Sequence, residues 1–303
     1  MIPTFPNFKK LELNDRNAIE DFTKQFPPYN DFEFIDLWIY NPRTDTAISI
    51  LDNNLVVNRQ DYITDESFYT FLGTNNAKNT ITKLLLKSKE ENLAPQLKHI
   101  PEISIISSPN LQDFFSITED QDNFDYILSV NELVSLMGSK YHNKRNLVKL
   151  FKKLYSDYVI KRLDLTQDEI KQEIKKLFYL WEKQKGRKRS ETEIELIAVE
   201  KLFDLAGLRN ISGLGVYHKN KLIGFTTYHL LPGNYAGMSL QKGDNTYQGI
   251  YPFLNHETAK ILKELGCAYL NYEQDLGISG LKKAKKLWRP VFYLKKYIIK
   301  ERA

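Results

Sequence analysis

The fold is decided by one run in the second half of the chain, Gly213-Leu-Gly-Val-Tyr-His-Lys-Asn-Lys-Leu-Ile-Gly-Phe-Thr-Thr-Tyr-His-Leu-Leu-Pro-Gly-Asn-Tyr-Ala-Gly-Met-Ser-Leu-Gln241. Two turn signals interrupt it, Lys219-Asn220 and Pro232-Gly233-Asn234, because these residue types adopt the backbone angles that tight turns need. The run is otherwise rich in aromatic and β-branched residues. It therefore predicts three antiparallel strands, at residues 213–218, 221–230 and 235–241.

The flanking segments extend this run to a mixed sheet. Downstream, residues 253–265 predict a helix and residues 267–272 a strand. Upstream, a strand at 158–163 precedes a helix that opens at the capping box Thr166-Gln-Asp-Glu169 and a second helix at 191–205. Three antiparallel strands, a helix and a strand beside the third occur in this order in acyltransferase cores of the GNAT type. Periodicity alone also fits other α/β layouts.

The first half predicts a second α/β unit. Its expected elements are a strand at 32–40, a hairpin at 47–51 and 54–58, a strand at 68–72, a helix at 81–91 and a strand at 103–107. At 303 residues the chain exceeds the usual size of one core. We therefore expect an α/β protein with mixed α+β sheets in two domains, 1–128 and 157–303, joined by a helix at 129–156. The last strand of the second domain is expected at 291–299.

The expected joining helix carries an apolar face at helical spacing. Its members are Val130, Val134, Met137, Tyr141, Val148 and Tyr155. If the helix is continuous through Gly138, Lys144 and Arg145 fall beside this face and point inward or toward a groove, where they need a partner. A break at Gly138-Ser139 would instead leave both cations on the surface. The sequence leaves these alternatives open.

A second run carries the most polar chemistry, Asn271-Tyr-Glu-Gln-Asp-Leu-Gly-Ile-Ser-Gly-Leu-Lys-Lys-Ala-Lys-Lys-Leu-Trp-Arg-Pro290. It leaves a predicted strand, whose period of two places Asn271, Glu273 and Asp275 on one side. Such groups face a cleft, solvent or internal cations. Glu273 or Asp275 is thus a candidate catalytic proton acceptor for an attacking amine. The structural alternative is an ion pair with a lysine. The lysines in question are Lys144, Lys282 and Lys285.

The junction before the helix at 253–265 is a candidate cofactor site. Backbone amides at a strand-to-helix turn lack partners, and the helix dipole favours an anion such as a coenzyme pyrophosphate. The junction reads Gln248-Gly-Ile-Tyr-Pro252, and Gly249 would let a phosphate approach the main chain. The candidate cofactor-binding residues are Gln241, Gln248, Gly249, Ile250 and Tyr251. In the alternative, a plain helix-initiating loop, Gly249 serves only the turn.

Two segments, Lys140-Tyr-His-Asn-Lys-Arg-Asn146 and residues 271–290, resemble the DUF2156 family, which includes the C-terminal domain of the phosphatidylglycerol lysyltransferases. Within the second segment, the matching pieces are Asp275-Leu-Gly277, Gly280-Leu281 and Ala284-Lys285. Lys282 stands where the family has an arginine, so the planar fork for an oxyanion is lost. The resemblance implies tandem GNAT-like (acyl-CoA N-acyltransferase-like) domains.

The resemblance also implies an acyl- or aminoacyltransferase whose second domain carries the site. The donor would be acyl-CoA (coenzyme A) or, by analogy with the lysyltransferases, aminoacyl-tRNA, and the acceptor an amine or hydroxyl. The candidate substrate-binding residues are His142, Lys144, Arg145, Asn271, Lys282 and Lys285. A non-catalytic GNAT-like module that binds RNA, a nucleotide or anionic lipid is the alternative.

Charge and composition narrow the partners. Residues 1–135 carry 11 Lys/Arg and 21 Asp/Glu, whereas residues 136–303 carry 32 and 17. A basic half attracts phosphate groups of a coenzyme, a tRNA or an anionic lipid surface, although lysines that only solvate the surface give the same count. No apolar run approaches the roughly 18 residues of a bilayer helix, so we expect a cytoplasmic protein. The five histidines show no ligand spacing, so no metal site is expected. A DNA partner is not expected either.

Overall fold

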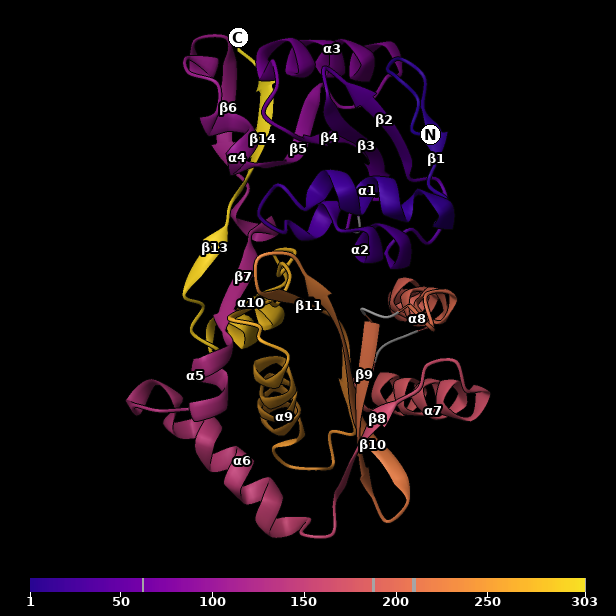
Figure 1. Ribbon diagram of the computed structural model, residues 1–303, viewed down its shortest axis with the longest axis vertical. Helices are drawn as coiled ribbons and strands as arrows, with labels where there is room; N and C mark the ends of the chain where they lie inside the picture. Colours follow the sequence, from indigo (N-terminus) through magenta and orange to yellow (C-terminus); the bar gives the residue numbers. More distant parts are fainter. Residues whose placement is uncertain (62, 187–188, 209–210, 303) are drawn as a thin grey trace. The chain divides into compact units, whose positions relative to one another are not determined.

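The computed structural model describes residues 1–61, 63–186, 189–208 and 211–302. The chain divides into two compact units, each built on a seven-stranded mixed sheet with helices packed against it (Figure 1). Unit 1 comprises Met1–Tyr126, Gln274–Ala284 and Tyr293–Ala303, and unit 2 comprises Ile127–Glu273 and Lys285–Phe292. The predicted fold class, a mixed α/β protein with two mixed sheets, is confirmed.

The sheet of unit 1 has the order β1-β2-β3-β4-β5-β14-β6. Its strands are β1 (Lys9–Lys10), β2 (Ala47–Leu51), β3 (Asn54–Gln60), β4 (Ser67–Leu72), β5 (Gln96–Pro101), β14 (Lys296–Glu301) and β6 (Phe115–Glu119). Strands β2, β3 and β4 are antiparallel, whereas β4 and β5 run parallel. The parallel pair requires a crossover, and α3 (Ala77–Glu90) supplies it by burying Ile81, Leu84 and Leu85 against the sheet. The predicted hairpin and the strand at 68–72 are therefore confirmed.

Two predicted strands of unit 1 are helices instead. Residues 32–40 form the end of a 3-10 turn (Asn30–Phe32) and α2 (Phe34–Ile39). This helix is buried on nearly all sides, so its apolar residues show no helical periodicity that sequence could reveal. Residues 103–107 fall in α4 (Glu102–Ile106), which begins directly after Pro101. The remaining helix of the amino-terminal region is α1 (Arg16–Thr23).

The sheet of unit 2 has the order β13-β7-β12-β11-β10-β9-β8. Its strands are β13 (Phe292–Leu294), β7 (Asp125–Ser129), β12 (Tyr269–Asn271), β11 (Tyr235–Gly243), β10 (Lys221–Leu231), β9 (Ile211–His218) and β8 (Val159–Leu163). Strands β8 to β11 are antiparallel, and β11 and β12 are parallel around α9 (Ile250–Glu264). The three-strand prediction from residues 213–241 is confirmed.

The two sheets exchange strands. β14, at the end of the chain, lies antiparallel between β5 and β6 of unit 1, while β7, from the first half, lies antiparallel to β12 of unit 2. The prediction that residues 291–299 form one strand of the second domain is therefore wrong. They contribute to β13 and β14, which belong to different sheets, and the expected domain 157–303 has to be corrected accordingly.

The expected helix between the domains is broken. It consists of α5 (Val130–Ser135), a 3-10 turn (Ser139–Tyr141) and α6 (His142–Leu154). Leu136 and Gly138 take positive φ angles of 47° and 83°, which end α5 because right-handed helix requires negative φ. The expected break near Gly138 is thus confirmed, whereas the expectation that it leaves Lys144 and Arg145 on the surface is wrong, because both are partly buried.

Several helices pack in unit 2. Besides α5, α6 and α9 they are α7 (Asp168–Gln184), α8 (Arg189–Asp204) and α10 (Ser279–Lys286), the last of which straddles the two units. Phe151 of α6 and Phe253 of α9 stack at 4.2 Å between ring centroids, within a core that includes Leu214, Val216 and Ile223 of the sheet. The predicted capping box does not form, since Gln167 is the N-cap of α7 and makes no side-chain cap. Within the described part of the chain, none of the helices has the length and apolar character that crossing a lipid bilayer requires.

Candidate functional site

A β-bulge interrupts β11 near its middle. Thr227 pairs with Leu240 but the next residue of β10 pairs with Met238, so Ser239 is an extra residue on β11. The Thr227 hydroxyl accepts a hydrogen bond from the Leu240 N–H at 3.1 Å, which compensates for the disturbed ladder. Bulges of this kind change the direction of neighbouring side chains and are frequent beside functional sites.

Strands β11 and β12 separate at the same level. Their pairing runs only from Tyr235 with Tyr269 to Gly237 with Asn271, although β11 continues to Gly243. Ligands of open α/β sheets bind beyond the carboxyl ends of parallel strands. The polar side chains around Gly237 and Asn271 are therefore the first candidates for chemistry.

His229 lies beside this point on β10, paired with Gly237, which in turn pairs with Asn271. Its ring is 1% exposed, and burial lowers the pKa of His229 to about 3, so the imidazole is neutral at physiological pH. Nδ1 lies 3.2 Å from the Ser239 Oγ, whereas Nε2 has no hydrogen-bond partner among the described residues. Such an orphaned buried nitrogen is rare in native proteins. The sequence gives no sign of this environment, because nothing local to His229 indicates that it is buried.

A second polar group lies between β10, β11 and α9. The Gln241 amide donates to the Thr226 hydroxyl at 2.9 Å and to the Asn255 side chain at 2.8 Å. The Asn255 amide lies 3.3 Å from the Tyr272 hydroxyl. Burial, and then the Glu273 charge, raise the pKa of Tyr272. The predicted residue Gln241 thus belongs to a neutral hydrogen-bonded chain that ends directly after β12.

The residues after β12 do not alternate as predicted. The strand ends at Asn271, and Glu273 takes a φ of 58° while its N–H donates to the Asn271 side chain at 2.9 Å. The prediction that period two puts Asn271, Glu273 and Asp275 on one side is therefore wrong. Lys285 is buried, donates to the Tyr272 carbonyl and lies 4.7 Å from that ring. Asn271, Glu273 and Lys285 are thus the predicted residues that unit 2 brings to this point.

Asp275 and Lys282 belong to unit 1. Asp275 is fully buried and accepts hydrogen bonds from the Tyr126 hydroxyl at 2.5 Å and from the Gly277 N–H at 2.9 Å. Lys282 forms an exposed ion pair with Asp122 at 2.7 Å. Both residues have structural partners within unit 1.

The turn that opens α9 is packed against α6. Gly249 has a φ of 87°, and a Cβ at this position would lie 2.6 Å from the Leu147 carbonyl oxygen. The Gln248 N–H donates to the Tyr155 hydroxyl at 3.2 Å. The α6 segment therefore contacts this turn at both Gly249 and Gln248. These contacts favour the alternative in which Gly249 serves the turn.

The two residues after Gly249 are also engaged within unit 2. The Ile250 N–H donates to the Tyr247 carbonyl at 3.1 Å, and the Ile250 side chain packs over Gly224 and Gly243. The Tyr251 hydroxyl lies 3.4 Å from the Gly243 carbonyl, and burial raises the pKa of Tyr251 to about 12. Their use as cofactor ligands remains a prediction.

The basic residues at the start of α6 have mixed surroundings. His142 is exposed. Lys144 lies over the Trp288 ring at 4.3 Å, and burial lowers its pKa. Arg145 donates to carbonyls of the turn that breaks the helix, including Gly138 at 3.2 Å. Lys144 is thus a partly desolvated cation, whereas Arg145 stabilises the turn.

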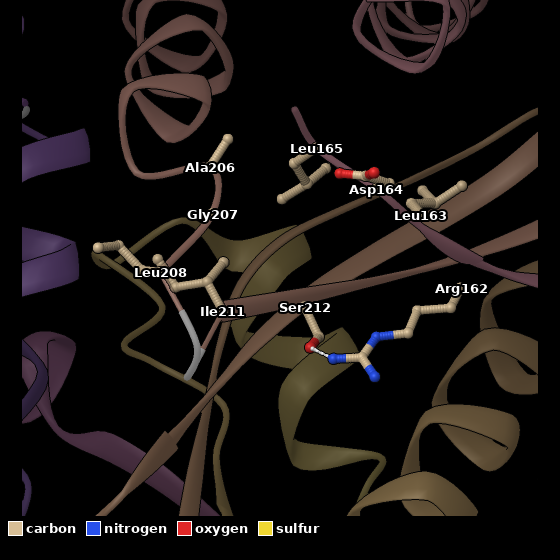
Figure 2. Close-up of a pocket in the computed structure, with 9 residues that line it drawn as sticks. All are labelled: Arg162, Leu163, Asp164, Leu165, Ala206, Gly207, Leu208, Ile211 and Ser212. Atoms are coloured by element: carbon tan, nitrogen blue, oxygen red, sulfur yellow. Dashed lines mark hydrogen bonds between the residues drawn. The ribbon is translucent and has the colours of Figure 1, made fainter. Parts of the chain in front are cut away.

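A pocket of about 290 Å³ lies at the edge of the sheet (Figure 2). It is lined by Arg162, Leu163, Asp164, Leu165, Ala206, Gly207, Leu208, Ile211 and Ser212. The Arg162 guanidinium donates to the Ser212 hydroxyl at 2.8 Å, and Ile211 pairs with His229 across the sheet. Hydrogen bonds from Thr166 lower the pKa of Asp164. No residue of this pocket was predicted, because Arg162 and Ser212 carry no motif.

The described residues were also compared with the arrangements of side chains that bind metal ions. Across the residues that the structure describes, no group of three or more His, Cys, Asp or Glu side chains is arranged to hold a metal ion.

Comparison with known proteins places the chain in a family. The model for the C-terminal part of phosphatidylglycerol lysyltransferase matches residues 25–300. A conserved protein of unknown function from Bacteroides thetaiotaomicron is 28% identical, with a TM-score of 0.84 over 100% of both chains. The C-terminal domain (DUF2156) of a protein described as a lysylphosphatidylglycerol synthetase from Agrobacterium fabrum is 9% identical, with a TM-score of 0.67 over 96% of this chain and 92% of that one.

A curated relative gives a weaker match. An uncharacterized protein of Mycoplasmoides gallisepticum is 25% identical over 189 residues, which span 61% of this chain and 58% of that protein. The resemblance seen at residues 140–146 and 271–290 is confirmed by the family match across nearly the whole chain. The chain belongs to the family described as phosphatidylglycerol lysyltransferase, C-terminal.

Proposed function

We propose that unit 2 transfers an aminoacyl group to an amine or hydroxyl acceptor. The observation that carries the proposal is the polar group where β11 and β12 separate. There, hydrogen bonds join Gln241 to Asn255 and Asn255 to the Tyr272 hydroxyl. Glu273 follows Tyr272 in the chain, and Lys285 donates to the Tyr272 carbonyl. Membership of a lysyltransferase family supports the reaction class. Fold likeness alone would not, because one fold serves many reactions.

An aminoacyl-tRNA donor fits the chain better than acyl-CoA. The amino-terminal turn of α9, the expected place for a coenzyme pyrophosphate, packs against Leu147 and Tyr155. The basic half of the chain provides charge for a longer phosphate backbone. In the transfer, the acceptor oxygen or nitrogen bonds to the aminoacyl carbonyl carbon and the ester to the tRNA ribose breaks. The acceptor's proton leaves through a base, and the ribose oxygen leaves protonated.

Glu273 is the proposed base. Its positive φ and the hydrogen bond from its N–H to Asn271 fix its backbone beside the strand end, and positioned carboxylates contribute about 10²–10⁴-fold to such proton transfers. Lys285, held on the Tyr272 carbonyl, is the nearby cation of unit 2 and would bind negative charge on the donor or the transition state.

The test is a transfer assay with radiolabelled lysyl-tRNA, phosphatidylglycerol vesicles and a parallel reaction with acetyl-CoA and an amine. We expect label in the lipid only with the tRNA donor. Glu273→Gln should lower kcat by about 100-fold or more without changing the midpoint of urea unfolding. Glu264→Gln, at an exposed position of α9, is the matched control. Equal losses of activity and stability in Glu273→Gln would mean that Glu273 has a structural role.

A non-catalytic binding module is the second candidate function, and the occupied turn before α9 favours it. In that case tRNA or lipid would bind saturably to the purified chain while label never moves. Stabilisation by coenzyme A at micromolar concentration would instead favour acyl-CoA as donor.

A further inference from the structure

The pocket in Figure 2 lies where two strands of unit 2 stop pairing at the edge of the sheet. β8 pairs with β9 as far as Leu163, opposite Gly213, whereas β10 continues to pair with β9 as far as Ile211. After Leu163 the chain turns, and the Asp164 carboxylate stabilises the turn by accepting hydrogen bonds from the Thr166 N–H at 3.0 Å and from its hydroxyl at 2.6 Å. This turn leaves a pocket of about 290 Å³ beside the first residues of β9.

Apolar side chains line much of this pocket. They include Leu163, Leu165, Leu208 and Ile211, of which Leu163 and Leu165 are 3% and 5% exposed. Leu163 packs directly over Gly215, where an added Cβ would lie only 2.6 Å from the Leu163 Cδ2. Ligand pockets typically measure about 300–1,000 Å³. The volume of this pocket therefore suits a short apolar group and is too small for a coenzyme or a lipid.

A cation is available at the same pocket. The Arg162 guanidinium donates to the Ser212 hydroxyl at 2.8 Å (Figure 2), and it forms no ion pair with any residue that the structure describes. Ser212 is 8% exposed and also hydrogen-bonds to the Tyr228 side chain, so it holds the guanidinium in place. The Asp164 carboxylate lines the pocket too, but it already accepts three hydrogen bonds from the turn that follows it. The pocket therefore keeps positive charge for an anion.

We propose that this pocket binds a small carboxylate with an apolar tail. The planar fork of Arg162 matches the two oxygens of a carboxylate, and the leucine and isoleucine side chains remove the tail from water. Inorganic phosphate would use the cation but leave the apolar wall in water. A free amino acid would add an ammonium group beside the guanidinium, and the Asp164 carboxylate already has its donors.

This pocket is distinct from the polar group where β11 and β12 separate. Ile211 pairs with His229 of β10, which pairs with Gly237 of β11, so the pocket lies on the β9 side of His229. Glu273 and Lys285 are not among its lining residues. Binding of a carboxylate here does not require the proposed transfer reaction, so the two proposals can fail separately.

Isothermal titration calorimetry of the full chain with isocaproate, which is leucine without its amino group, tests the site. We expect saturable binding at millimolar concentration or below, and weaker binding of leucine and of inorganic phosphate. Arg162→Gln should weaken the binding of isocaproate about 10- to 100-fold, because a hydrogen bond to a charged group is lost. Arg162→Lys keeps the charge without the fork, so its loss should be smaller.

The matched control is Lys161→Gln. Lys161 is the preceding cation of β8, but its ammonium lies 4.6 Å from the centre of the Tyr217 ring and it does not line the pocket. This control should bind isocaproate as the unchanged chain does. Three outcomes would overturn the proposal: no binding of isocaproate, equally tight binding of leucine or phosphate, or equal losses in Arg162→Gln and Lys161→Gln. Urea unfolding separates loss of binding from loss of the fold, and Arg162→Lys carries the comparison if Arg162→Gln does not fold.

Discussion

Units 1 and 2 contain sheets with the same arrangement of strands, but the side chains buried beside the parallel strand differ. In both, three antiparallel strands lead through a helix to a parallel strand, β4 to β5 in unit 1 and β11 to β12 in unit 2. An exchanged antiparallel strand follows in each case, β14 in unit 1 and β7 in unit 2. Next to the parallel strand, unit 1 buries a cluster of charged side chains, whereas unit 2 buries the uncharged side chains of His229, Asn255 and Asn271 together with a lysine, Lys285.

The charges of unit 1 form a closed cluster. Lys296 is fully buried, donates to Asp31 and lies 2.7 Å from Asp125. Asp31 also accepts from Arg59 at 3.1 Å and lies 3.0 Å from His99. Burial opposes ionisation of Asp31, but Lys296 and its other cationic neighbours hold its pKa well below the usual value. Mutual pairing on this scale fixes geometry but leaves little capacity for a ligand.

The charged cluster of unit 1 lies where the two exchanged strands begin. Asp125 and Lys296 are the first residues of β7 and β14, the two strands that the halves of the chain exchange. Their ion pair therefore joins the first residues of the two exchanged strands, and we expect it to stabilise the exchange.

Removing the central cation is the strongest way to break this difference. Lys296→Met would leave two buried carboxylates without their cation, and we expect a loss of about 3–5 kcal/mol in the free energy of unfolding. Lys300→Met, at an exposed position of the same strand, should change it by less than about 0.5 kcal/mol. Urea unfolding measures both. Equal, small losses would show that the cluster does not lock the exchanged strands.

The strands and turns of unit 2 can be predicted from the sequence, whereas the exchange of strands between the two sheets cannot. Lys219 and Asn220 take φ angles of 49° and 59°, the left-handed values that short hairpin turns require, so residue type alone located the strands around them. The exchange of β14 and β7 pairs segments far apart in the chain. No local pattern encodes such a choice, and Lys296 in an exposed sequence context reads as a surface lysine.

The candidate site shows the same limit. Asn271 and Glu273 were predicted because polar residues at a strand end face a cleft, solvent or a cation. Gln241 was predicted from the junction before a helix and Lys285 from the family resemblance, and the roles of all four stay predictions. The division of the carboxyl run between two units separated Asp275 and Lys282 from them. His229 was missed because its importance comes from burial and from its cross-strand neighbour Gly237, which only the register reveals.

Opposite responses to pH would sharpen the difference between the units. Burial raises the pKa of Glu33 in unit 1 to about 8, so the folded state favours the protonated acid. That contribution to stability is present below the unfolded pKa of about 4.5 and is lost as pH rises through about 8. Burial lowers the pKa of His229 in unit 2 to about 3. Its contribution is present above the unfolded pKa of about 6.5 and is lost as pH falls toward 3.

Two variants isolate these responses. Relative to the unchanged chain, Glu33→Gln should gain about 2–4 kcal/mol between pH 5 and pH 8. His229→Asn should gain a similar amount between pH 7 and pH 4. Urea unfolding at a series of pH values gives both differences, in which the titration of all other groups cancels. Parallel curves for a variant and the unchanged chain would mean that the residue titrates normally in the folded state.

The smallest expected effect concerns the packing of His229 against Gly237 in unit 2. A Cβ at Gly237 would lie 2.4 Å from the Cε1 of His229, so Gly237→Ala should cost about 1–3 kcal/mol by overpacking. Adding His229→Ala should recover part of that cost, because the clash partner is gone, and the double-mutant cycle measures the coupling. Gly280→Ala, with no atom within 4 Å of its Cβ, is the control. Additive losses would mean that the ring moves freely, and then His229 could not hold a fixed position beside Ser239.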